Sequence, residues 1–192
     1  MYRKNLKDEY YTRKAREENY PARSVYKLQE IDEKFKIFKI GDYVLDLGCA
    51  PGSWLMYITE KVGARGRAIG TDIIGLKIKL PENAEFIKLD IIDFNIDKTF
   101  DVIVSDVAPH TSGEHFIDAE NSLEYCERAL EIVRINLKKG GNFVCKILEG
   151  EGTSEFFQKI KKSFELAKIY KPKASRKESR ETYIIGKNYA AN

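Results

Sequence analysis

The stretch that decides the fold is Tyr43–Trp54, with the sequence YVLDLGCAPGSW. An apolar run here passes through a turn of Gly and Pro into a helical pattern, and open α/β sheets bind nucleoside cofactors at such a strand-to-helix join. Gly48 and Gly52 let the backbone approach a ligand, and Pro51 stiffens the turn. The free amides of a helix that starts near Ser53 suit an anionic group. The stretch therefore predicts a nucleoside-binding loop.

Short apolar runs alternate with helical stretches after Gly41, which is the pattern of a mostly parallel sheet with helices on both faces. We expect seven strands, at residues 43–47, 68–72, 85–89, 102–105, 142–147, 165–170 and 182–186. Helices are expected at residues 6–18, 23–35, 53–61, 117–137 and 153–162. Because no helical stretch separates the last two strands, the sheet should end in an antiparallel hairpin. The sequence thus predicts a Rossmann-like α/β fold.

Composition bounds the class of protein. The 192 residues, 43% hydrophobic and 33% charged, suit a single domain over residues 1–192, with residues 1–39 as a basic helical extension and residues 40–192 as the core. No apolar run is long enough to span a membrane, and residues 1–5 lack a signal-peptide apolar region, so we expect a cytoplasmic protein. Cys49, Cys126 and Cys145 have no paired spacing, which predicts packing residues and neither a disulfide framework nor a metal site.

Charge is distributed unevenly along the chain. Residues 1–39 carry 11 Lys/Arg against 7 Asp/Glu, and residues 159–192 carry 10 against 3. The residues between them are acidic, with 12 against 20. Basic runs are often only solvated faces, but a segment such as Lys168–Lys177 favours contact with a polyanion. The ends of the chain therefore predict binding of a nucleic acid.

The spacing of the loop separates two classes of cofactor. A dinucleotide turn places three glycines in a G-x-G-x-x-G run to admit a pyrophosphate, whereas here Gly48 is followed by Pro51 and Gly52. S-adenosylmethionine has no phosphate, carries a sulfonium cation and ends in an amino acid. Asp46 at the strand tip suits its cationic part, and the helix amides suit its carboxylate. The loop therefore predicts S-adenosylmethionine as the cofactor.

Two further acids follow predicted strands. Asp72 ends the second strand, where an acid binds ribose hydroxyls in such folds. Asp90 ends the third strand and could accept a hydrogen bond from the adenine amino group. Either acid could instead be a helix cap or a loop charge. Trp54, in the first turn of the helix, would lie beside the ligand or in the core.

The second half of the chain supplies candidates for chemistry. Asp106 ends a strand beside the switch point of the sheet, in a run that lacks the Asn/Asp-Pro-Pro-aromatic pattern common in amino-group methyltransferases. Lys146 lies inside an apolar strand, where a charge is costly unless it is paired, functional or able to reach water. Such a lysine can act as a base or orient a hydroxyl. Lys27 and Glu181, taken singly, are more often surface charges.

Together these segments resemble the FtsJ family of RNA ribose 2′-O-methyltransferases. The motifs, in family order, are residues 23–32, 46–54, 105–113, 143–146 and 179–183, and the resemblance spans residues 8–186. It implies a Lys-Asp-Lys-Glu quartet around the target ribose at Lys27, Asp106, Lys146 and Glu181. It also implies cofactor contacts at Gly52, Trp54, Asp72, Asp90 and Asp106. Ser53 replaces the usual second Gly of the loop, and Cys49 stands where Ala is frequent.

The resemblance implies roles for these residues. Lys146 would act as the base or orient the 2′-hydroxyl, Asp106 would steer Lys146 and the methyl group, and Lys27 and Glu181 would hold the ribose. The basic flanks would contact phosphate, while unpaired bases could stack on Tyr10, Tyr11 or Tyr20.

The expected substrate is a uridine of 23S large-subunit ribosomal RNA, methylated by a monomer. Alternatives are the tRNA anticodon loop or the messenger cap as substrate, a non-catalytic RNA-binding ribosome-assembly factor, and a small-molecule methyltransferase. Retention of all four quartet side chains disfavours the assembly factor. The basic flanks disfavour a small-molecule substrate.

Overall fold

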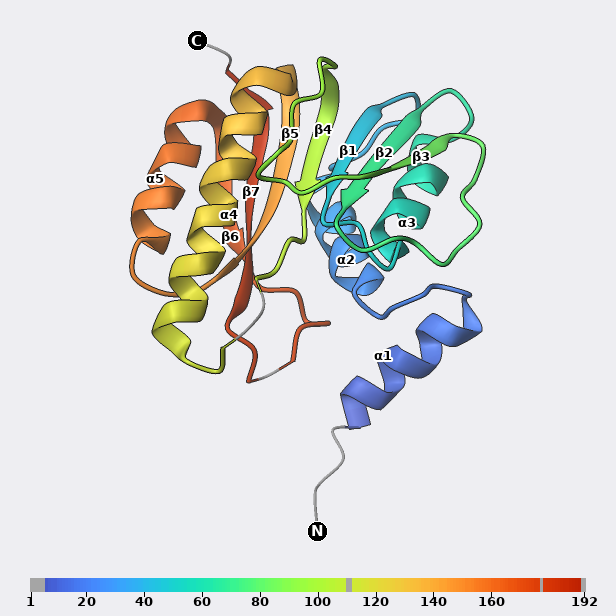
Figure 1. Ribbon diagram of the computed structural model, residues 1–192, viewed down its shortest axis with the longest axis horizontal. Coiled ribbons are helices and arrows are strands. Elements are labelled where there is room, and N and C mark those ends of the chain that lie inside the picture. Colours follow the sequence, from blue (N-terminus) through green and yellow to red (C-terminus); the bar gives the residue numbers. More distant parts are fainter. Residues whose placement is uncertain (1–5, 110–111, 177, 191–192) are drawn as a thin grey trace.

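The predicted alternation of strands and helices is present in the computed structural model, which describes residues 6–109, 112–176 and 178–190 (Figure 1). The strands are β1 (Tyr43–Leu47), β2 (Arg67–Asp72), β3 (Ala84–Lys88), β4 (Phe100–Ser105), β5 (Leu137–Leu148), β6 (Phe164–Tyr170) and β7 (Glu181–Tyr189). The helices are α1 (Leu6–Glu17), α2 (Val25–Phe35), α3 (Ser53–Val62), α4 (His115–Asn136) and α5 (Thr153–Ser163). Residues 1–5, residues 110–111 within the predicted motif 105–113, and Lys177 of the basic segment lie outside the described residues.

All seven strands form one sheet in the order β3-β2-β1-β4-β5-β7-β6. The first five strands in this order pair in parallel, and β7 runs antiparallel to both β5 and β6. The predicted fold class and the antiparallel hairpin are therefore confirmed, with β7 inserted between β5 and β6. The chain order reverses between β1 and β4, and ligands of open α/β sheets bind at the carboxyl ends of strands at this kind of switch point.

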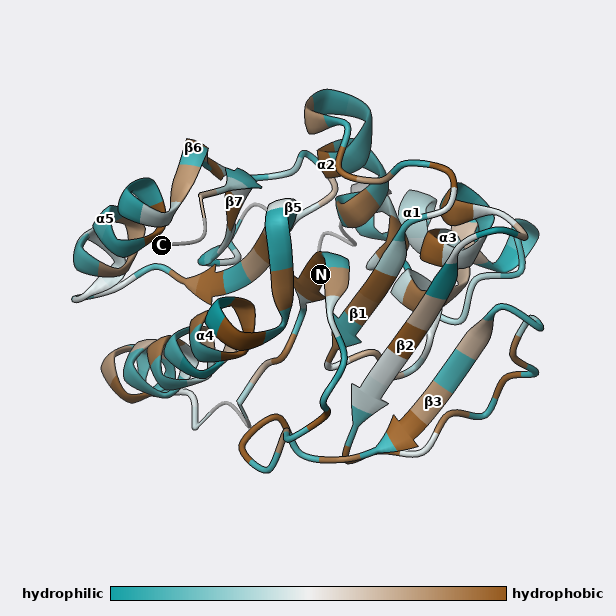
Figure 2. Ribbon diagram, turned by 90° about the horizontal axis from the view of Figure 1, so that it is seen from above, coloured by the Kyte–Doolittle hydropathy of each residue, from teal (hydrophilic) through white to brown (hydrophobic). Residues whose placement is uncertain are grey.

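Helices cover both faces of the sheet (Figure 2). Val44, Val102 and Tyr183 face the side covered by α2 and α3, where they join one buried apolar cluster. Their sequence neighbours Leu45 and Ile103 face the opposite side and pack with α4 and α5 in a second cluster. Because alternate strand residues point to opposite faces, the apolar character of both neighbours explains why these strands read as continuous apolar runs.

The largest difference from the predicted boundaries is at the α4–β5 join. The predicted helix 117–137 includes Leu137, but α4 ends at Asn136 and Leu137 has an extended backbone at the start of β5. The predicted strand 142–147 is therefore too short. Leu137 pairs with Phe100 of β4, and the register shifts between Phe100 and Val102. A tertiary pairing thus decides the join, which the local apolar pattern cannot distinguish from a last helical turn.

Two composition-based expectations can be compared with the structure. Cys49, Cys126 and Cys145 are buried free thiols, as predicted for packing residues. Within the described residues, no helix has the length and apolar character needed to cross a membrane.

Candidate active site

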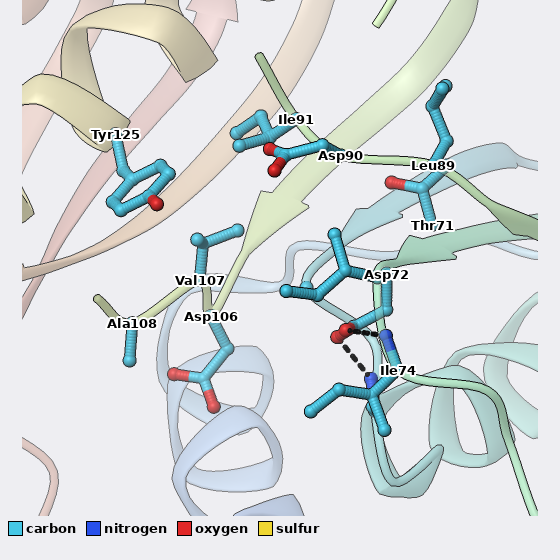
Figure 3. A pocket seen from close by; sticks show the side chains of 13 residues that line it. Thr71, Asp72, Ile74, Leu89, Asp90, Ile91, Asp106, Val107, Ala108 and Tyr125 are labelled. Atoms are coloured by element: carbon cyan, nitrogen blue, oxygen red, sulfur yellow. Dashed lines mark hydrogen bonds between the residues drawn. The ribbon is translucent and has the colours of Figure 1, made fainter. Parts of the chain in front are cut away.

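A pocket lies at the switch point, at the carboxyl ends of β1, β2, β3 and β4 (Figure 3). Each of these strands ends close to one predicted cofactor residue that lines the pocket, namely Gly48, Asp72, Asp90 and Asp106 in turn. Apolar side chains complete the walls, and Tyr125 of α4 closes one side. The structure thus brings four of the nine predicted cofactor residues into one cavity.

Gly48 is a position where only glycine fits without strain. Its φ is +75°, and an added Cβ would lie 2.8 Å from the backbone nitrogen of Val107. The amide of Gly48 donates to the carbonyl of Thr71 at the end of β2. The turn after β1 therefore passes tightly between the ends of β2 and β4, and this tight passage shapes the floor of the pocket.

The two outer acids are held by backbone amides. Asp72 accepts hydrogen bonds from the amides of Ala50 and Ile74, at 2.9 and 2.8 Å. Asp90 accepts one from the amide of Ile92 at 3.0 Å. Each ionised carboxylate has four acceptor positions, so further lone pairs remain for ligand donors. Hydroxyl and amino groups of a nucleoside are the donors that this arrangement fits.

The rest of the predicted cofactor loop does not line this pocket. Ser53 is buried and accepts a hydrogen bond from the amide of Ala22 at 2.7 Å. Trp54 is also buried, and its indole donates to the carbonyl of Ser24 at 3.0 Å. These contacts fasten the start of α3 to the segment before α2. Trp54 occupies a core position, which was one of its two predicted places.

Pro51 and Gly52 form the turn directly before α3. Pro51 is exposed, and Gly52 caps α3 with a φ of +110°. A Cβ on Gly52 would lie 2.4 Å from Cδ1 of Ile78, so the β2–β3 connection packs closely over the helix start. Contact of Pro51, Gly52, Ser53 and Trp54 with a cofactor stays a prediction.

Asp46 differs from the acids that line the pocket. It is completely buried, and neither carboxylate oxygen has a hydrogen-bond partner among the described residues. Burial, followed by the negative charges of Asp106 and Asp72, raises the pKa of Asp46 well above its ordinary value. The sequence predicts a carboxylate facing the cofactor, whereas the protein alone favours a neutral carboxylic acid behind the pocket wall.

The four residues of the predicted quartet meet beside this pocket. The Lys27 ammonium lies 2.8 Å from the Glu181 carboxylate, and the Lys146 ammonium lies 3.1 Å from the Asp106 carboxylate. Lys146 also donates to the backbone carbonyl of Asp106 at 2.6 Å and lies 4.0 Å from Glu181. The quartet is thus two ion pairs linked through Lys146. Lys27 and Lys146 are buried, so neither is the simple surface charge that a single lysine suggests.

Strand register explains this convergence. In the β5–β7 pair, Lys146 stands opposite Tyr183 and Leu148 stands opposite Glu181. Directly opposed residues, and residues two apart along one strand, point to the same face of a sheet. Lys146 and Glu181 therefore project to the side that α2 covers, where α2 supplies Lys27.

Tyr183 is a site residue that the sequence reasoning did not assign. Its hydroxyl donates to Asp106 at 2.9 Å, and its ring is fully buried 5.9 Å from that of Trp54. Burial, followed by the charges of Asp106 and Glu181, raises the pKa of Tyr183 well above its ordinary value, so the phenol stays protonated and donates. The signal for it was the two-residue spacing from Glu181, which places both side chains on one face.

Glu181 is ionised in this setting. Burial alone would raise its pKa, but the charge and hydrogen bond of Lys27, the charge of Lys146 and a hydrogen bond from Ser179 together lower the pKa below its ordinary value. The Ser179 hydroxyl donates to Glu181 at 3.0 Å. The quartet therefore holds a fixed carboxylate between two lysines.

A second cavity opens on the quartet. Lys27, Lys146 and Glu181 line it, together with Arg23 from before α2 and Arg176 from the β6–β7 connection. Ala108 lines both this cavity and the pocket at the switch point. The two cavities therefore adjoin along the segment that follows β4, and a group transferred between them would pass Asp106.

The predicted stacking tyrosines fall in different environments. Tyr10 is about half exposed, at 49%. Tyr11 lies against Tyr26, with ring centroids 5.3 Å apart. Tyr20 is buried, and its hydroxyl donates to Glu60. The expectation that Tyr20 stacks on a base is therefore wrong, because its ring faces the core.

Comparison with known proteins identifies the family. The family model described as FtsJ-like methyltransferase matches residues 20–189. "Ribosomal RNA large subunit methyltransferase E" of Desulfatibacillum aliphaticivorans is 46% identical over 189 residues, which are 95% of this chain and 91% of that protein. The protein of the same name from Bdellovibrio bacteriovorus is 42% identical, over 95% of this chain and 96% of its own.

Solved structures agree as well. A crystal structure of a Plasmodium falciparum protein assigned as a ribosomal RNA methyltransferase superposes with a TM-score of 0.80 at 29% identity, covering 90% of this chain and all of that one. Aeropyrum pernix fibrillarin, solved with bound S-adenosyl-L-methionine, has a TM-score of 0.59 at 17% identity, covering 85% of this chain and 76% of that one, and shares the fold. With the family model spanning nearly the whole described chain, this protein belongs to the FtsJ-like methyltransferase family.

Proposed function

We propose that this protein transfers a methyl group from S-adenosylmethionine to a ribose 2′-hydroxyl of large-subunit ribosomal RNA. The observation that carries the proposal is the position of the Lys27, Asp106, Lys146 and Glu181 quartet, directly beside a pocket lined by three acids and open to a cavity with two arginines. A methyl donor and a nucleic-acid acceptor need two adjoining sites of this kind.

The pocket fits the donor. Asp72 has lone pairs for ribose hydroxyls, and Asp90 has them for an adenine amino group. Asp106 supplies negative charge where a sulfonium cation would lie. The fibrillarin structure, which shares the fold, contains bound S-adenosyl-L-methionine and supports the same assignment. When bound, this cofactor supplies an electrophilic methyl group on its sulfonium sulfur.

The quartet prepares the acceptor. Lys146 already contacts two oxygens of Asp106, so its ammonium has a donor left for a 2′-oxygen that enters between it and Glu181. In this assignment the Lys146 ammonium orients the hydroxyl, or Lys146 first loses a proton to solvent and its neutral amine then takes the hydroxyl proton. Lys27 and Glu181 hold the ribose. Alignment of an attacking oxygen with the methyl group can lower the barrier by several kcal/mol.

Two features support ribosomal RNA as the acceptor. The curated relatives that cover more than nine-tenths of this chain carry the name of a large-subunit ribosomal RNA methyltransferase. Arg23 and Arg176 line the cavity of the quartet, where phosphates of a bound RNA would lie. We further propose that the methylated residue is a uridine of 23S ribosomal RNA and that the protein acts as a monomer.

The test is incubation with labelled S-adenosylmethionine and separate pools of large subunits, naked ribosomal RNA and tRNA. We expect label in 23S ribosomal RNA, followed by mapping of a 2′-O-methyl uridine. Label in tRNA alone would contradict the ribosomal substrate. Binding of ribosomal RNA without methyl transfer to any pool would indicate an assembly factor instead. The wild-type protein should also bind RNA with a steep dependence on salt.

A further inference from the structure

Asp8 of α1 joins two arginines that come from opposite ends of the chain. Its Oδ1 lies in contact with the Arg23 guanidinium at 2.5 Å, and its Oδ2 lies 2.9 Å from Nε of Arg176. Arg23 precedes α2, and Arg176 lies in the β6–β7 connection. Figure 1 shows α1 and this connection at the same end of the molecule. One carboxylate therefore bridges two cations with both of its oxygens.

The two arginines also line the cavity of the quartet, whereas Asp8 does not. Asp8 thus holds both side chains from outside the cavity into which a ribose would be bound under the proposed function. Any nucleotide with its ribose between Lys146 and Glu181 carries phosphates on both sides of that ribose. Arg23 and Arg176 line the same cavity and can receive one of them.

The basic side chains of this cavity are paired with acidic side chains of the same protein. Lys27 and Lys146 pair with Glu181 and Asp106, while the arginines share Asp8. Glu178 also lines the cavity. An incoming phosphate adds a negative charge, so it binds the arginines favourably when an acid leaves them. Asp8 is the acid that contacts both.

We infer that Arg23 and Arg176 form a binding site for an RNA backbone phosphate, and that Asp8 occupies this site until RNA replaces it. This inference rests on the proposed function. A carboxylate and a phosphodiester each carry one negative charge and accept paired hydrogen bonds from guanidinium groups, so one can take the place of the other. The Arg176 side chain is 63% exposed, and an ion pair this open contributes little stability. The pair of Asp8 with Arg23 is less open, with side chains 23% and 17% exposed, so the phosphate must replace this contact as well as the weaker one with Arg176.

The test is the affinity of Asp8→Asn for a transcript of large-subunit ribosomal RNA, measured by filter binding over a series of salt concentrations. Removal of the competing charge should tighten binding about threefold to tenfold. The Arg176→Gln variant should bind more weakly, and its salt dependence should fall by about one phosphate contact. In the double variant, Asp8→Asn should give a smaller gain, because of the two cations that it releases only Arg23 remains.

Glu17→Gln is the matched control. Glu17 lies on the same helix, in an exposed pair with Arg13, so its replacement removes the same charge away from the cavity. An equal gain with Glu17→Gln, an undiminished gain without Arg176, or weaker or unchanged binding by Asp8→Asn would each overturn the inference. Thermal unfolding of each variant identifies an effect that comes from a damaged fold.

The inference and the proposed function can fail separately. If the wild type methylates ribosomal RNA but Asp8→Asn binds it no more tightly, the exchange is wrong and the function stands. If Asp8→Asn binds the transcript more tightly but neither the variant nor the wild type methylates a ribose, the phosphate site stands and the function is wrong.

Discussion

The pocket at the switch point and the quartet beside it lie at one end of the sheet but are assembled differently. The pocket takes its acids from the ends of consecutive strands, within residues 48–106. The quartet joins Lys27 to Glu181, which are 154 positions apart, through Lys146 on the strand between α4 and α5. Its charges are paired with one another, whereas among the described residues Asp72 and Asp90 accept hydrogen bonds from backbone amides and form no ion pair. The difference suggests that the pocket binds and the quartet reacts.

The strongest test of this division is Lys146→Ala. Loss of the ammonium removes the group that contacts the 2′-oxygen, so single-turnover methyl transfer should fall about 10²- to 10⁴-fold. Cofactor affinity, measured by calorimetry, should change little because Lys146 does not line the pocket. Lys138→Ala is the control, since Lys138 lies near the other end of β5 in an exposed pair with Asp101. Near-normal transfer by Lys146→Ala would remove the quartet from the chemistry.

Asp90→Asn addresses the pocket in the same way. The amide keeps an oxygen for the Ile92 N–H but loses the charge and the two acceptor positions of the other oxygen, so cofactor affinity should fall about tenfold. The rate of transfer at saturating cofactor should change far less. Asp93→Asn, three residues along the same loop and outside the pocket, should leave cofactor affinity unchanged. A large fall in rate at saturating cofactor would contradict the assignment of Asp90 to binding alone.

Tyr183→Phe examines the link between the two regions. The lost hydrogen bond to Asp106 should slow transfer by about fivefold, the equivalent of about 1 kcal/mol. The effect should appear in the rate and not in cofactor affinity, because Tyr183 does not line the pocket. Tyr189→Phe at the end of the same strand is the control. An unchanged rate would mean that Asp106 is held well enough without the phenol.

Asp46→Asn should change stability by a smaller amount, with a defined pH dependence. The folded protein raises the pKa of Asp46, so above about pH 4, the ordinary carboxyl value, the folded state holds a proton that the unfolded state releases. Stability of the wild type therefore falls as pH rises, and Asp46→Asn removes this loss. We expect a gain of about 1 kcal/mol at pH 7, or about 2–4 °C in Tm, and almost none at pH 4. A loss of stability at both pH values would contradict an unpartnered acid.

Much of the fold was predictable because it is local. Every residue of Tyr43–Leu47 except Asp46 is apolar, whichever face of the sheet its side chain points to. Gly48 and Gly52, in the turn that follows, have positive φ. Strand and helix periods and turn residues carry this information in short windows. The α4–β5 boundary was missed because Leu137 satisfies both periods, and only its pairing with Phe100 selects the strand.

The site residues were predictable only in part. Asp72, Asp90 and Asp106 could be placed from the strand ends that precede them, whereas Lys27 and Glu181 read alone as surface charges and entered only through the family resemblance. Trp54 was ambiguous because an aromatic side chain near a ligand loop has the same local sequence whether it faces the ligand or the core. Its burial and its contacts with Ser24 and Tyr183 give it a core position, and its contact with a cofactor stays a prediction.

The sequence by itself determined that an apolar strand meets a glycine turn at Tyr43–Trp54, that acids follow the neighbouring strands, and that a lysine interrupts an apolar strand at position 146. These are properties of neighbouring residues. Only the tertiary structure decided that Asp46 is buried with no hydrogen-bond partner in the described part of the chain, that Tyr183 supports Asp106, and that Asp8 holds Arg23 and Arg176. The physical reason is that pKa values, ion pairs and cavities depend on which distant segments the sheet register brings together.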